Sequence, residues 1–383
     1  MDTLKNLFLL DPEVIFLNHG SLGACPRPVF EIYQTWQRLL EDQPVKFMRE
    51  LAGFNREARH ALGTYLHANP DDLAFVTNAT TGVNIIAHSL SLQPGDEILT
   101  TDQEYGACDN TWSFICRKTG AAYIHRAVML PPVSPEDLVE KFWQGVTERT
   151  KLIYLSHLTS PTALRLPVEE LCRRARQNSI LTFIDGAHAP GQIPLDLEAL
   201  GADFYTGNCH KWMMSPKGAG FLYARREVQR MVQPLVISRA YDPEEILASG
   251  SPSMDYLTWN GTRDPSAFLS IPAAIEFMQK HHWDEVRQQC HALLYQAISR
   301  ICDLTGLAPF YPLDSDFYAQ MAIAPLPPEV DPENLKNRLY DEYHIEIPVF
   351  QWHHHKVIRI SVQGYNTPSD IDVLLKALGT LLR

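Results

Sequence analysis

An acidic residue and a histidine stand at the end of one strongly apolar stretch. In FIDGAHAPGQ (183–192) an apolar run ends in Asp185, and His188 follows three residues later. A carboxylate at the end of a buried strand costs free energy unless it is paired. Asp185 therefore either caps the next turn or serves as the partner of a cationic ring nitrogen, and both interpretations fit the residues.

A lysine with aromatic neighbours lies 26 residues beyond that aspartate. In TGNCHKWMMSPKGAG (206–220), Lys211 stands between His210 and Trp212, after a second apolar stretch. An amine that apolar neighbours desolvate has a lowered pKa and acts as a nucleophile. The alternative is a lysine whose ammonium group reaches water along the surface.

A third stretch, TNATTGVN (77–84), places small residues between a strand end and the start of a helix. Free N–H groups at a helix N-terminus suit a phosphate, as do the hydroxyls of Thr80 and Thr81. Thr and Asn are also ordinary N-cap residues, which is the alternative. Together with Asp185 and Lys211, the stretch supplies the three anchors of a pyridoxal phosphate (PLP) site: a phosphate cradle, a ring-nitrogen partner and a Schiff-base lysine.

These side chains can meet only if strands and helices bring them to one edge of a sheet. Apolar segments with strand character alternate with amphipathic helical segments from residue 73 to residue 225. The expected strands are 73–78, 96–101, 121–129, 150–157, 180–185, 202–208 and 219–225, and the expected helices are 80–90, 134–146 and 167–179. Strands that are apolar throughout indicate an α/β fold with a buried, mainly parallel sheet. Ligands in such folds bind at the carboxyl ends of the strands.

Beyond residue 265 the pattern changes to that of a smaller α+β unit. The sequence predicts a long helix over 267–283, a helical continuation over 284–305, strands near 318–324 and 356–362, and a last helix over 369–382. We therefore expect a large PLP-binding α/β domain over 17–265 and a small C-terminal α+β domain over 266–383. Segment 1–16 is expected to pack near the small domain.

Charge, hydropathy and cysteine usage exclude several classes of protein. The chain has 383 residues and a formal net charge of -12, so its field does not attract nucleic acid or an anionic membrane. No run of about 18 apolar residues predicts a membrane span, and the N-terminus lacks a signal-peptide pattern. Seven scattered cysteines without a CxxC pair indicate reduced thiols. We expect a cytoplasmic protein with neither nucleic acid nor membrane as a partner.

Three consecutive histidines, 353–355, resemble a metal-binding run. Consecutive residues point in different directions on a strand or a loop, so three in a row rarely bind one ion. We therefore expect no metal. Their position just before Arg359 leaves two interpretations, contact with a substrate side chain or an exposed loop.

Seven ordered motifs resemble the class V aminotransferases, which are fold-type I PLP enzymes. The most similar subgroup is that of the isopenicillin N epimerase-like proteins, which is related to the cysteine desulfurases. The motifs are FLNHGSLG (16–23), TNATTGVN (77–84), DQEYGA (102–107), SHLTSPTALRLP (156–167), DGAHAPGQIPLDLEALGADFYTGNCHKW (185–212), GTRD (261–264) and RISVQGYNT (359–367). The resemblance covers most of the chain and implies a PLP-dependent enzyme that acts at the α-carbon of an amino acid.

The resemblance implies a role for several matched residues around the cofactor. Lys211 would form the covalent link to PLP and then move the α-proton, while Asp185 would keep the pyridine nitrogen protonated. His188 would lie beside the ring near its 3-hydroxyl. Phosphate contacts are implied for three residues: Thr80, Thr81 and His210.

Further roles concern the ring face, the partner subunit and the substrate. Tyr105 would stack on the cofactor ring, or it is a plain core tyrosine, and Ser160 falls where desulfurases carry an Asn on the cofactor hydroxyl. Thr262 would reach the phosphate of the neighbouring subunit, which implies a homodimer with shared active sites. Arg359 would bind the substrate α-carboxylate through its planar fork. Two residues are implied to line the substrate cleft: Asn18 and His19.

One departure from the family bears on the reaction. Cysteine desulfurases carry a nucleophilic Cys shortly before the arginine, whereas residues 346–361 contain none. The sequence therefore favours an epimerase-like or aminotransferase activity, which share removal of the α-proton and differ in where the proton returns. The alternative is a C–S β-lyase that needs no persulfide cysteine. A protein that kept the fold and lost turnover is disfavoured by the presence of Lys211, Asp185 and Arg359.

Overall fold

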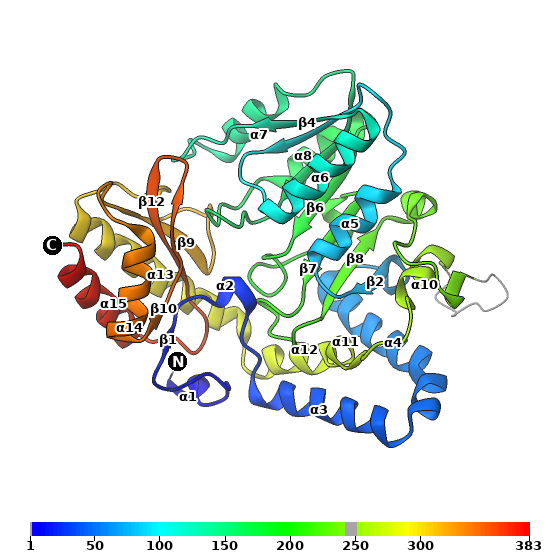
Figure 1. The fold of residues 1–383 in the computed structure, drawn as a ribbon, viewed down its shortest axis with the longest axis horizontal. Helices are drawn as coiled ribbons and strands as arrows, with labels where there is room; N and C mark the ends of the chain where they lie inside the picture. Colours follow the sequence, from blue (N-terminus) through cyan, green and yellow to red (C-terminus); the bar gives the residue numbers. More distant parts are fainter. Residues whose placement is uncertain (1, 242–250) are drawn as a thin grey trace.

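The computed structural model describes residues 2–241 and 251–383, and its centre is a sheet of seven strands (Figure 1). In the order β2-β8-β7-β6-β5-β3-β4, only β8 runs antiparallel to its neighbours. The strands are β2 (Leu73–Val76), β3 (Glu97–Thr101), β4 (Ala122–Arg126), β5 (Thr150–Ser156), β6 (Leu181–Gly186), β7 (Phe204–Asn208) and β8 (Gly220–Ala224). This sheet confirms the predicted α/β class.

Helices cover both faces of the sheet because successive strand residues point to opposite sides. In β5, Leu152 and Tyr154 belong to the apolar cluster that also holds residues of α5 and α6, whereas Ile153 and Leu155 pack in the cluster that holds residues of α7 and α8. A strand that is buried on both faces must be apolar throughout, which explains the continuous apolar runs. The helices of this unit are α5 (Ala79–Ser89), α6 (Gly106–Thr119), α7 (Pro135–Trp143), α8 (Val168–Gln177), α9 (Leu197–Leu200) and α10 (Pro252–Thr258).

A second unit is built on a three-stranded antiparallel sheet in the order β11-β12-β9. Its strands are β9 (Met321–Leu326), β11 (Val349–Trp352) and β12 (His355–Ser361), and its helices are α13 (Trp283–Thr305), α14 (Pro332–Tyr343) and α15 (Pro368–Leu381). Near the N-terminus, β1 (Ile15–Phe16) pairs in parallel with β10 (Ile345–Glu346), so the start of the chain contacts this unit. The domain boundary at residue 265 stays a prediction.

The predicted long helix over 267–283 is wrong. The structure has two helices there, α11 (Ser266–Leu269) and α12 (Ile271–Lys280), with Ser270 between them. Pro272 lies at the start of α12, where its missing N–H costs nothing, and it cannot continue a helix from the preceding turn. These two helices pack on two helices that precede the sheet, α3 (Arg27–Asp42) and α4 (Pro44–Leu66).

Several short helices and turns flank the two units. Near the N-terminus lie α1 (Asp2–Lys5) and α2 (His19–Leu22), and 3-10 turns occupy η1 (Pro70–Asp72), η2 (Arg226–Met231) and η3 (Arg239–Tyr241). Among the residues that the structure describes, no helix is long and apolar enough to cross a membrane.

Candidate active site

A cavity of about 230 Å³ lies at the carboxyl ends of the sheet strands, where a parallel α/β sheet binds its ligands. It is reached by the residues that end β5, β6 and β7 and by the residues that follow β2 and β3. Seven of the residues singled out from the sequence line it: Thr80, Tyr105, Ser160, Asp185, His188, His210 and Lys211. Residues up to 131 positions apart in the chain therefore line one cavity, as expected for groups at the carboxyl ends of neighbouring strands.

Asp185 is nearly the last residue of β6 and is 3% exposed. Its Oδ1 accepts the N–H of Ala187 at 2.9 Å, and its Oδ2 accepts the hydroxyl of Tyr154 at 3.1 Å and faces the thiol of Cys108 at 3.6 Å. Burial raises the pKa of Asp185 above its usual value despite these donors. A cationic group in the cavity would offset that cost.

Lys211 follows β7 and its amine is held by a buried histidine. The Nζ atom lies 3.2 Å from Nε2 of His188, whose Nδ1 lies 3.3 Å from the indole nitrogen of Trp212. Because an indole N–H can only donate, Nδ1 accepts and the proton of a neutral His188 resides on Nε2, directed at the amine. An amine that accepts a hydrogen bond is unprotonated, and so the pair favours the neutral base.

The pKa values agree with that assignment. Burial lowers the pKa of Lys211 to about 8, although the nearby Asp185 carboxylate raises it. Burial also lowers the pKa of His188 well below its usual value, and the charges of Lys211 and Arg359 act in the same direction. His188 is therefore neutral near physiological pH, and the fraction of Lys211 in the neutral form is far larger than for an exposed lysine and rises through pH 8.

The start of α5 forms the opposite wall. The carboxamide of Asn78 accepts the N–H of Thr81 at 2.8 Å, and that of Asn208 accepts the N–H of Ala79 at 2.8 Å. Between them, Thr80 lines the cavity. The hydroxyl of Thr81 is instead within 3.0 Å of Asn78 Oδ1, so Thr81 supports the helix start and does not line the cavity.

His210 lies beside this helix start with one nitrogen already engaged. Its Nδ1 lies 2.8 Å from the carbonyl oxygen of Ala219, which can only accept, so Nδ1 carries the proton. Burial lowers the pKa of His210 to about 4. An anion in the cavity would favour protonation of Nε2 and make His210 a donor to it.

Arg359 lies on β12 and is 8% exposed. Its Nη1 donates to the carbonyl oxygen of Ser160 at 2.5 Å and its Nη2 to the hydroxyl of Ser21 at 3.0 Å, and both serines line the cavity. No described residue accepts from Nε. Burial lowers the pKa of Arg359 to about 10, so the guanidinium stays charged near neutral pH. Its hydrogen-bond partners are a carbonyl oxygen and a hydroxyl, and no carboxylate of the described residues pairs with it.

Asn18 and His19 do not line this cavity. Asn18 accepts the hydroxyl of Ser21 and donates to Glu346 at 3.1 Å, so it fixes a residue that contacts Arg359. His19 is fully buried behind Lys211, with Nε2 3.0 Å from the Lys211 carbonyl oxygen. The N-terminal segment therefore contacts the site in two ways: His19 contacts the backbone of Lys211, and the hydroxyl of Ser21 accepts a hydrogen bond from Arg359.

Two other sequence features lie away from the cavity. Thr262 is exposed and does not line it. His353 and His354 form the turn between β11 and β12, and His355 is the first residue of β12. His353 Nε2 lies 3.4 Å from Asp102 Oδ2. The described residues contain no group of three or more side chains able to hold a metal ion.

Sequence reasoning missed Glu104, which is 6% exposed beside the site. Its carboxyl accepts the hydroxyl of Thr101 at 2.6 Å and both the N–H and the hydroxyl of Ser156, which lines the cavity. Burial raises the pKa of Glu104 to about 8. The motif DQEYGA contained the signal, because an acidic residue beside an apolar strand needs partners.

The arrangement fits PLP on its own chemistry. The cavity combines a buried amine that favours its neutral form, a buried carboxyl that lacks a cation, and a threonine at the N-terminus of an eleven-residue helix. These are the groups that the aldehyde, the pyridine nitrogen and the phosphate of PLP require. Fold and site together define a PLP-dependent enzyme.

Comparison with known proteins identifies the family. The family description "Aminotransferase class-V" matches residues 30–374. The chain is 35% identical to the isopenicillin N epimerase of Amycolatopsis lactamdurans, over 97% of this chain and 96% of that protein. It is 27% identical to a probable L-cysteine desulfhydrase of Arabidopsis thaliana, over 97% of this chain and 84% of that protein. The chain belongs to the class V aminotransferase family.

The fold is also that of solved relatives. A cysteine desulfurase from Thermococcus onnurineus superimposes with a TM-score of 0.84 at 20% identity, over 99% of this chain and 97% of that one. The cystine C–S lyase C-DES in complex with cysteine persulfide superimposes with a TM-score of 0.82 at 21% identity, over 96% and 98% of the two chains. These likenesses confirm the predicted fold-type I architecture.

Proposed function

We propose that this enzyme removes and returns the α-proton of an amino acid in an epimerase-like reaction, with Lys211 as the base. The observation that carries the proposal is the state of the Lys211 amine. Burial lowers its pKa to about 8, and Nε2 of His188 lies 3.2 Å from Nζ. When bound, PLP supplies the electron sink that acidifies the α-carbon. Identity of 35% and 34% to two isopenicillin N epimerases, over 97% and 98% of this chain, supports epimerisation within the family.

The residues around Lys211 have distinct proposed tasks. Arg359 takes the substrate α-carboxylate, since its guanidinium is buried and has an unused Nε and no anionic partner. Asp185 pairs with the pyridine nitrogen, and Thr80 and His210 hold the phosphate. Tyr105, half exposed at the cavity wall, covers one face of the ring.

Epimerisation needs proton delivery to both faces of the α-carbon, and Lys211 serves only one of them. Besides Lys211, the titratable residues that line the same cavity are Tyr105, Asp185, His188 and His210. Asp185 and His210 are assigned to the ring nitrogen and the phosphate of PLP, which leaves Tyr105 and His188. Because His188 already donates to Lys211, the Tyr105 hydroxyl is the proposed second proton donor. Replacement by Phe removes this proton and keeps the ring.

Hydrogen exchange tests the proposal. PLP-loaded enzyme is mixed with L- and D-amino acids in deuterated water, without a keto-acid acceptor. We expect one amino acid to exchange its α-proton and yield its mirror image, with Tyr105→Phe retaining exchange from one enantiomer only. A stoichiometric keto acid without ammonia would establish transamination instead, and an unreactive α-proton across the panel would contradict the proposal.

A second candidate is C–S β-elimination, because several curated relatives are named L-cysteine desulfhydrases. None of the seven cysteines lines the cavity, and burial raises the pKa of Cys108, which lies beside Asp185, far above its usual value. A persulfide on the protein is therefore not proposed, and such a lyase would act on the substrate alone. Release of sulfide, ammonia and pyruvate from L-cysteine would favour this candidate over epimerisation.

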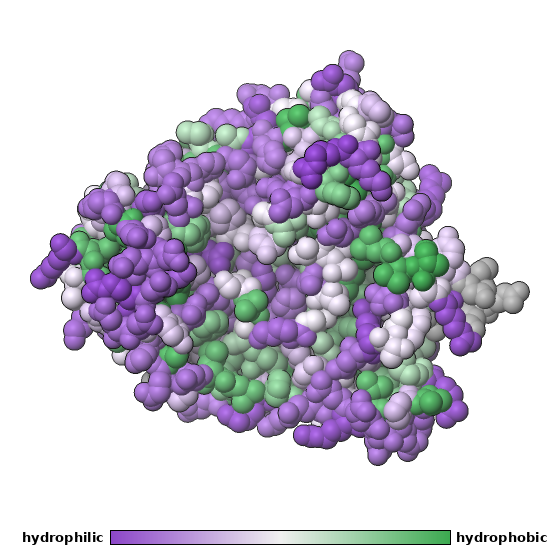
Figure 2. All heavy atoms as spheres, viewed as in Figure 1, coloured by the Kyte–Doolittle hydropathy of each residue, from purple (hydrophilic) through white to green (hydrophobic). Residues whose placement is uncertain are grey.

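We also propose a homodimer with shared sites. Figure 2 shows apolar side chains gathered on one face, below α2 and beside α10. Leu22, at the wall of the Lys211 cavity, is 67% exposed, and Val236 and Ile237 are 50% and 66% exposed. In this dimer, Thr262, which is exposed, is proposed to contact the phosphate in the partner's cavity, as the resemblance to the family implies.

A further inference from the structure

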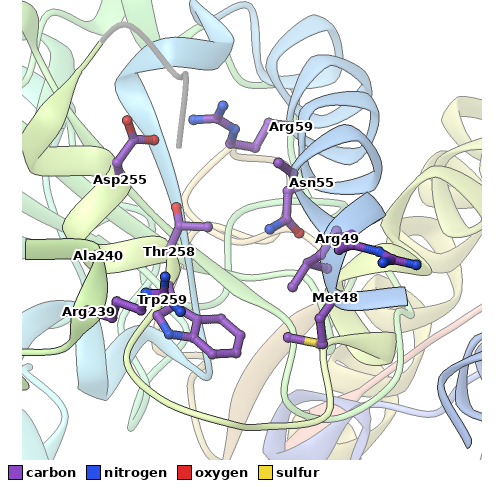
Figure 3. A pocket seen from close by; sticks show the side chains of 11 residues that line it. Met48, Arg49, Asn55, Arg59, Arg239, Ala240, Asp255, Thr258 and Trp259 are labelled. Carbon is purple, nitrogen blue, oxygen red and sulfur yellow. The ribbon is translucent and has the colours of Figure 1, made fainter. Parts of the chain in front are cut away.

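A second cavity, of about 260 Å³, lies between α4 and α10 (Figure 3). It shares no lining residue with the cavity of Lys211. Leu51, Asn55 and Arg59 follow one another at intervals of four on α4, so they lie on one face of that helix. The buried face of α4 is otherwise mostly apolar, and the two polar residues interrupt it where the cavity opens.

Arg59 is buried with most of its hydrogen-bonding capacity unused. It is 5% exposed, and among the described residues neither Nε nor Nη1 has a partner. Its ion pair is a long one, with 4.0 Å between Nη2 and Oδ1 of Asp71, whose side chain is 44% exposed. Burial lowers the pKa of Arg59 although Asp71 and Asp255 act to raise it. A buried guanidinium in this state calls for an acceptor that carries negative charge.

Asn55, unlike Arg59, requires a hydrogen-bond donor from whatever occupies the cavity. It is 6% exposed, and its Oδ1 has no donor among the described residues. An occupant that satisfies the wall must therefore accept from Arg59 and donate to Asn55 one helical turn away. A water molecule can do both, but it does not neutralise the guanidinium.

The rest of the lining favours an anion with an apolar body. Three arginines and one carboxylate line the cavity: Arg49, Arg59, Arg239 and Asp255. In Figure 3, Met48 and Trp259 lie below Arg59 and Asn55, with Arg239 beside Trp259 and the guanidinium of Arg49 turned away from Arg59. A cavity with the buried guanidinium of Arg59 at one end and apolar side chains at the other suits a small amphipathic acid.

We propose that this cavity binds a small carboxylate that carries a hydrogen-bond donor on the adjacent carbon and an apolar side group, as in a 2-hydroxy or 2-amino acid. The carboxylate pairs with Arg59, the donor reaches Asn55 Oδ1, and the side group packs on Trp259 and Met48. The site is separate from the chemistry at Lys211 and does not depend on it. A carboxylate side chain of a second copy has the same chemistry and is the competing occupant.

Mandelate is the probe, because it has the carboxylate, the hydroxyl and an aromatic group but no amine to react with the cofactor. Binding is measured by titration calorimetry on PLP-loaded protein that carries Arg359→Met, which removes the carboxylate anchor of the active site. We expect one mandelate per chain. Adding Arg59→Met should weaken binding at least about tenfold, as for loss of a charge-assisted pair. Adding Arg56→Met is the matched control, since Arg56 is an exposed arginine of the same helix, and should leave the affinity unchanged.

Phenylacetate, which lacks the hydroxyl, provides a second test that does not depend on the stability of the arginine variant. Asn55→Leu should abolish the preference for mandelate over phenylacetate while both still bind. The proposal is overturned if Arg59→Met leaves mandelate affinity unchanged. It is equally overturned if no mandelate binds and sedimentation shows that Arg59→Met dissociates an oligomer, because a second copy then fills the cavity.

Discussion

At the scale of single residues, the reactivity of Lys211 depends on a hydrogen-bond chain that ends in an indole. Trp212 fixes the tautomer of His188, and His188 in turn donates to the amine. Without the indole N–H, the imidazole can turn a lone pair toward Lys211 and stabilise the ammonium form. The sequence predicted a desolvated lysine next to this tryptophan, but the direction of each hydrogen bond emerged only from the folded positions.

Replacing Trp212 by Phe should therefore raise the pKa of Lys211. A neutral amine is needed to capture PLP, so in cofactor-free wild-type protein the rate of PLP incorporation should rise with pH through about 8. In Trp212→Phe the midpoint should move to higher pH. Trp112→Phe is the control, because Trp112 is equally buried and its indole nitrogen has no hydrogen-bond partner among the described residues. An unshifted midpoint in Trp212→Phe would contradict the tautomer assignment.

His19 links the site to acid stability. Burial lowers the pKa of His19 from 6.5 to about 3. Between these pH values the imidazole is protonated in the unfolded chain and neutral in the folded chain. The contribution of neutral His19 to the free energy of unfolding is therefore fully present above pH 6.5 and is lost as the pH falls toward 3. At pH 5.5, one unit below the unfolded pKa, the loss is about 1.4 kcal/mol.

The measurement is urea unfolding at pH 7.5 and 5.5. His19→Gln keeps polar atoms near Lys211 and Tyr365, and its free energy of unfolding should fall less between the two pH values than that of wild type, by about 1.4 kcal/mol. His60→Gln, at an exposed position of α4, should behave as wild type does. Equal pH dependence in His19→Gln and wild type would rule out this histidine as a source of acid sensitivity.

At the scale of elements, the phosphate end of the cavity depends on how closely α5 approaches the sheet. A Cβ placed on Gly82 of α5 would lie 2.2 Å from the hydroxyl oxygen of Thr206 in β7. Gly82→Ala should push the helix away and displace Thr80, with a loss of about 1–3 kcal/mol in stability and faster release of PLP. Thermal unfolding and dialysis against PLP-free buffer measure the two effects.

The control for that variant is another helical glycine. Gly53 lies in α4 and nothing would stand within 4 Å of an added Cβ. Gly53→Ala should stabilise the protein by about 0.5–1 kcal/mol, because alanine is the better helix former. If Gly82→Ala behaved in the same way, the contact of α5 with β7 would not limit the position of the helix.

The elements also show where sequence reasoning succeeds. The continuous apolar runs of β5 and β6 predicted buried parallel strands, whose carboxyl ends meet at one edge of the sheet. Seven of the fifteen residues that line the cavity are predicted from the sequence. The break at Ser270 was missed because apolar periodicity continues across Pro272. Arg59 was missed because its burial is set by α10, nearly 200 positions away in the chain.

At the scale of the whole molecule, the proposed dimer makes a prediction about mixed subunits. Thr262→Ala should weaken PLP retention if Thr262 contacts the partner's phosphate. A hybrid of one Lys211→Ala subunit and one Thr262→Ala subunit then contains one fully intact site, because Lys211 and Thr262 of that site come from different chains. Hybrids should bind PLP covalently with wild-type affinity at half the wild-type stoichiometry.

If Thr262 instead served its own chain, the hybrid would hold no intact site, and covalent PLP would be retained only with the weakened affinity of Thr262→Ala. Sedimentation of each pure variant is the companion measurement, since both must remain dimeric for the comparison. A monomeric wild-type protein at micromolar concentration would contradict shared sites outright.

The proposed reaction depends above all on Lys211, in the cavity at the strand ends, as the residue that carries PLP. Borohydride reduction of the PLP-loaded protein, followed by peptide mass spectrometry, tests it most directly. We expect one modified peptide per chain, with the label on Lys211, and none in Lys211→Ala. A label on Lys217, or a Lys211→Ala protein that still retains cofactor covalently, would show that another lysine carries PLP.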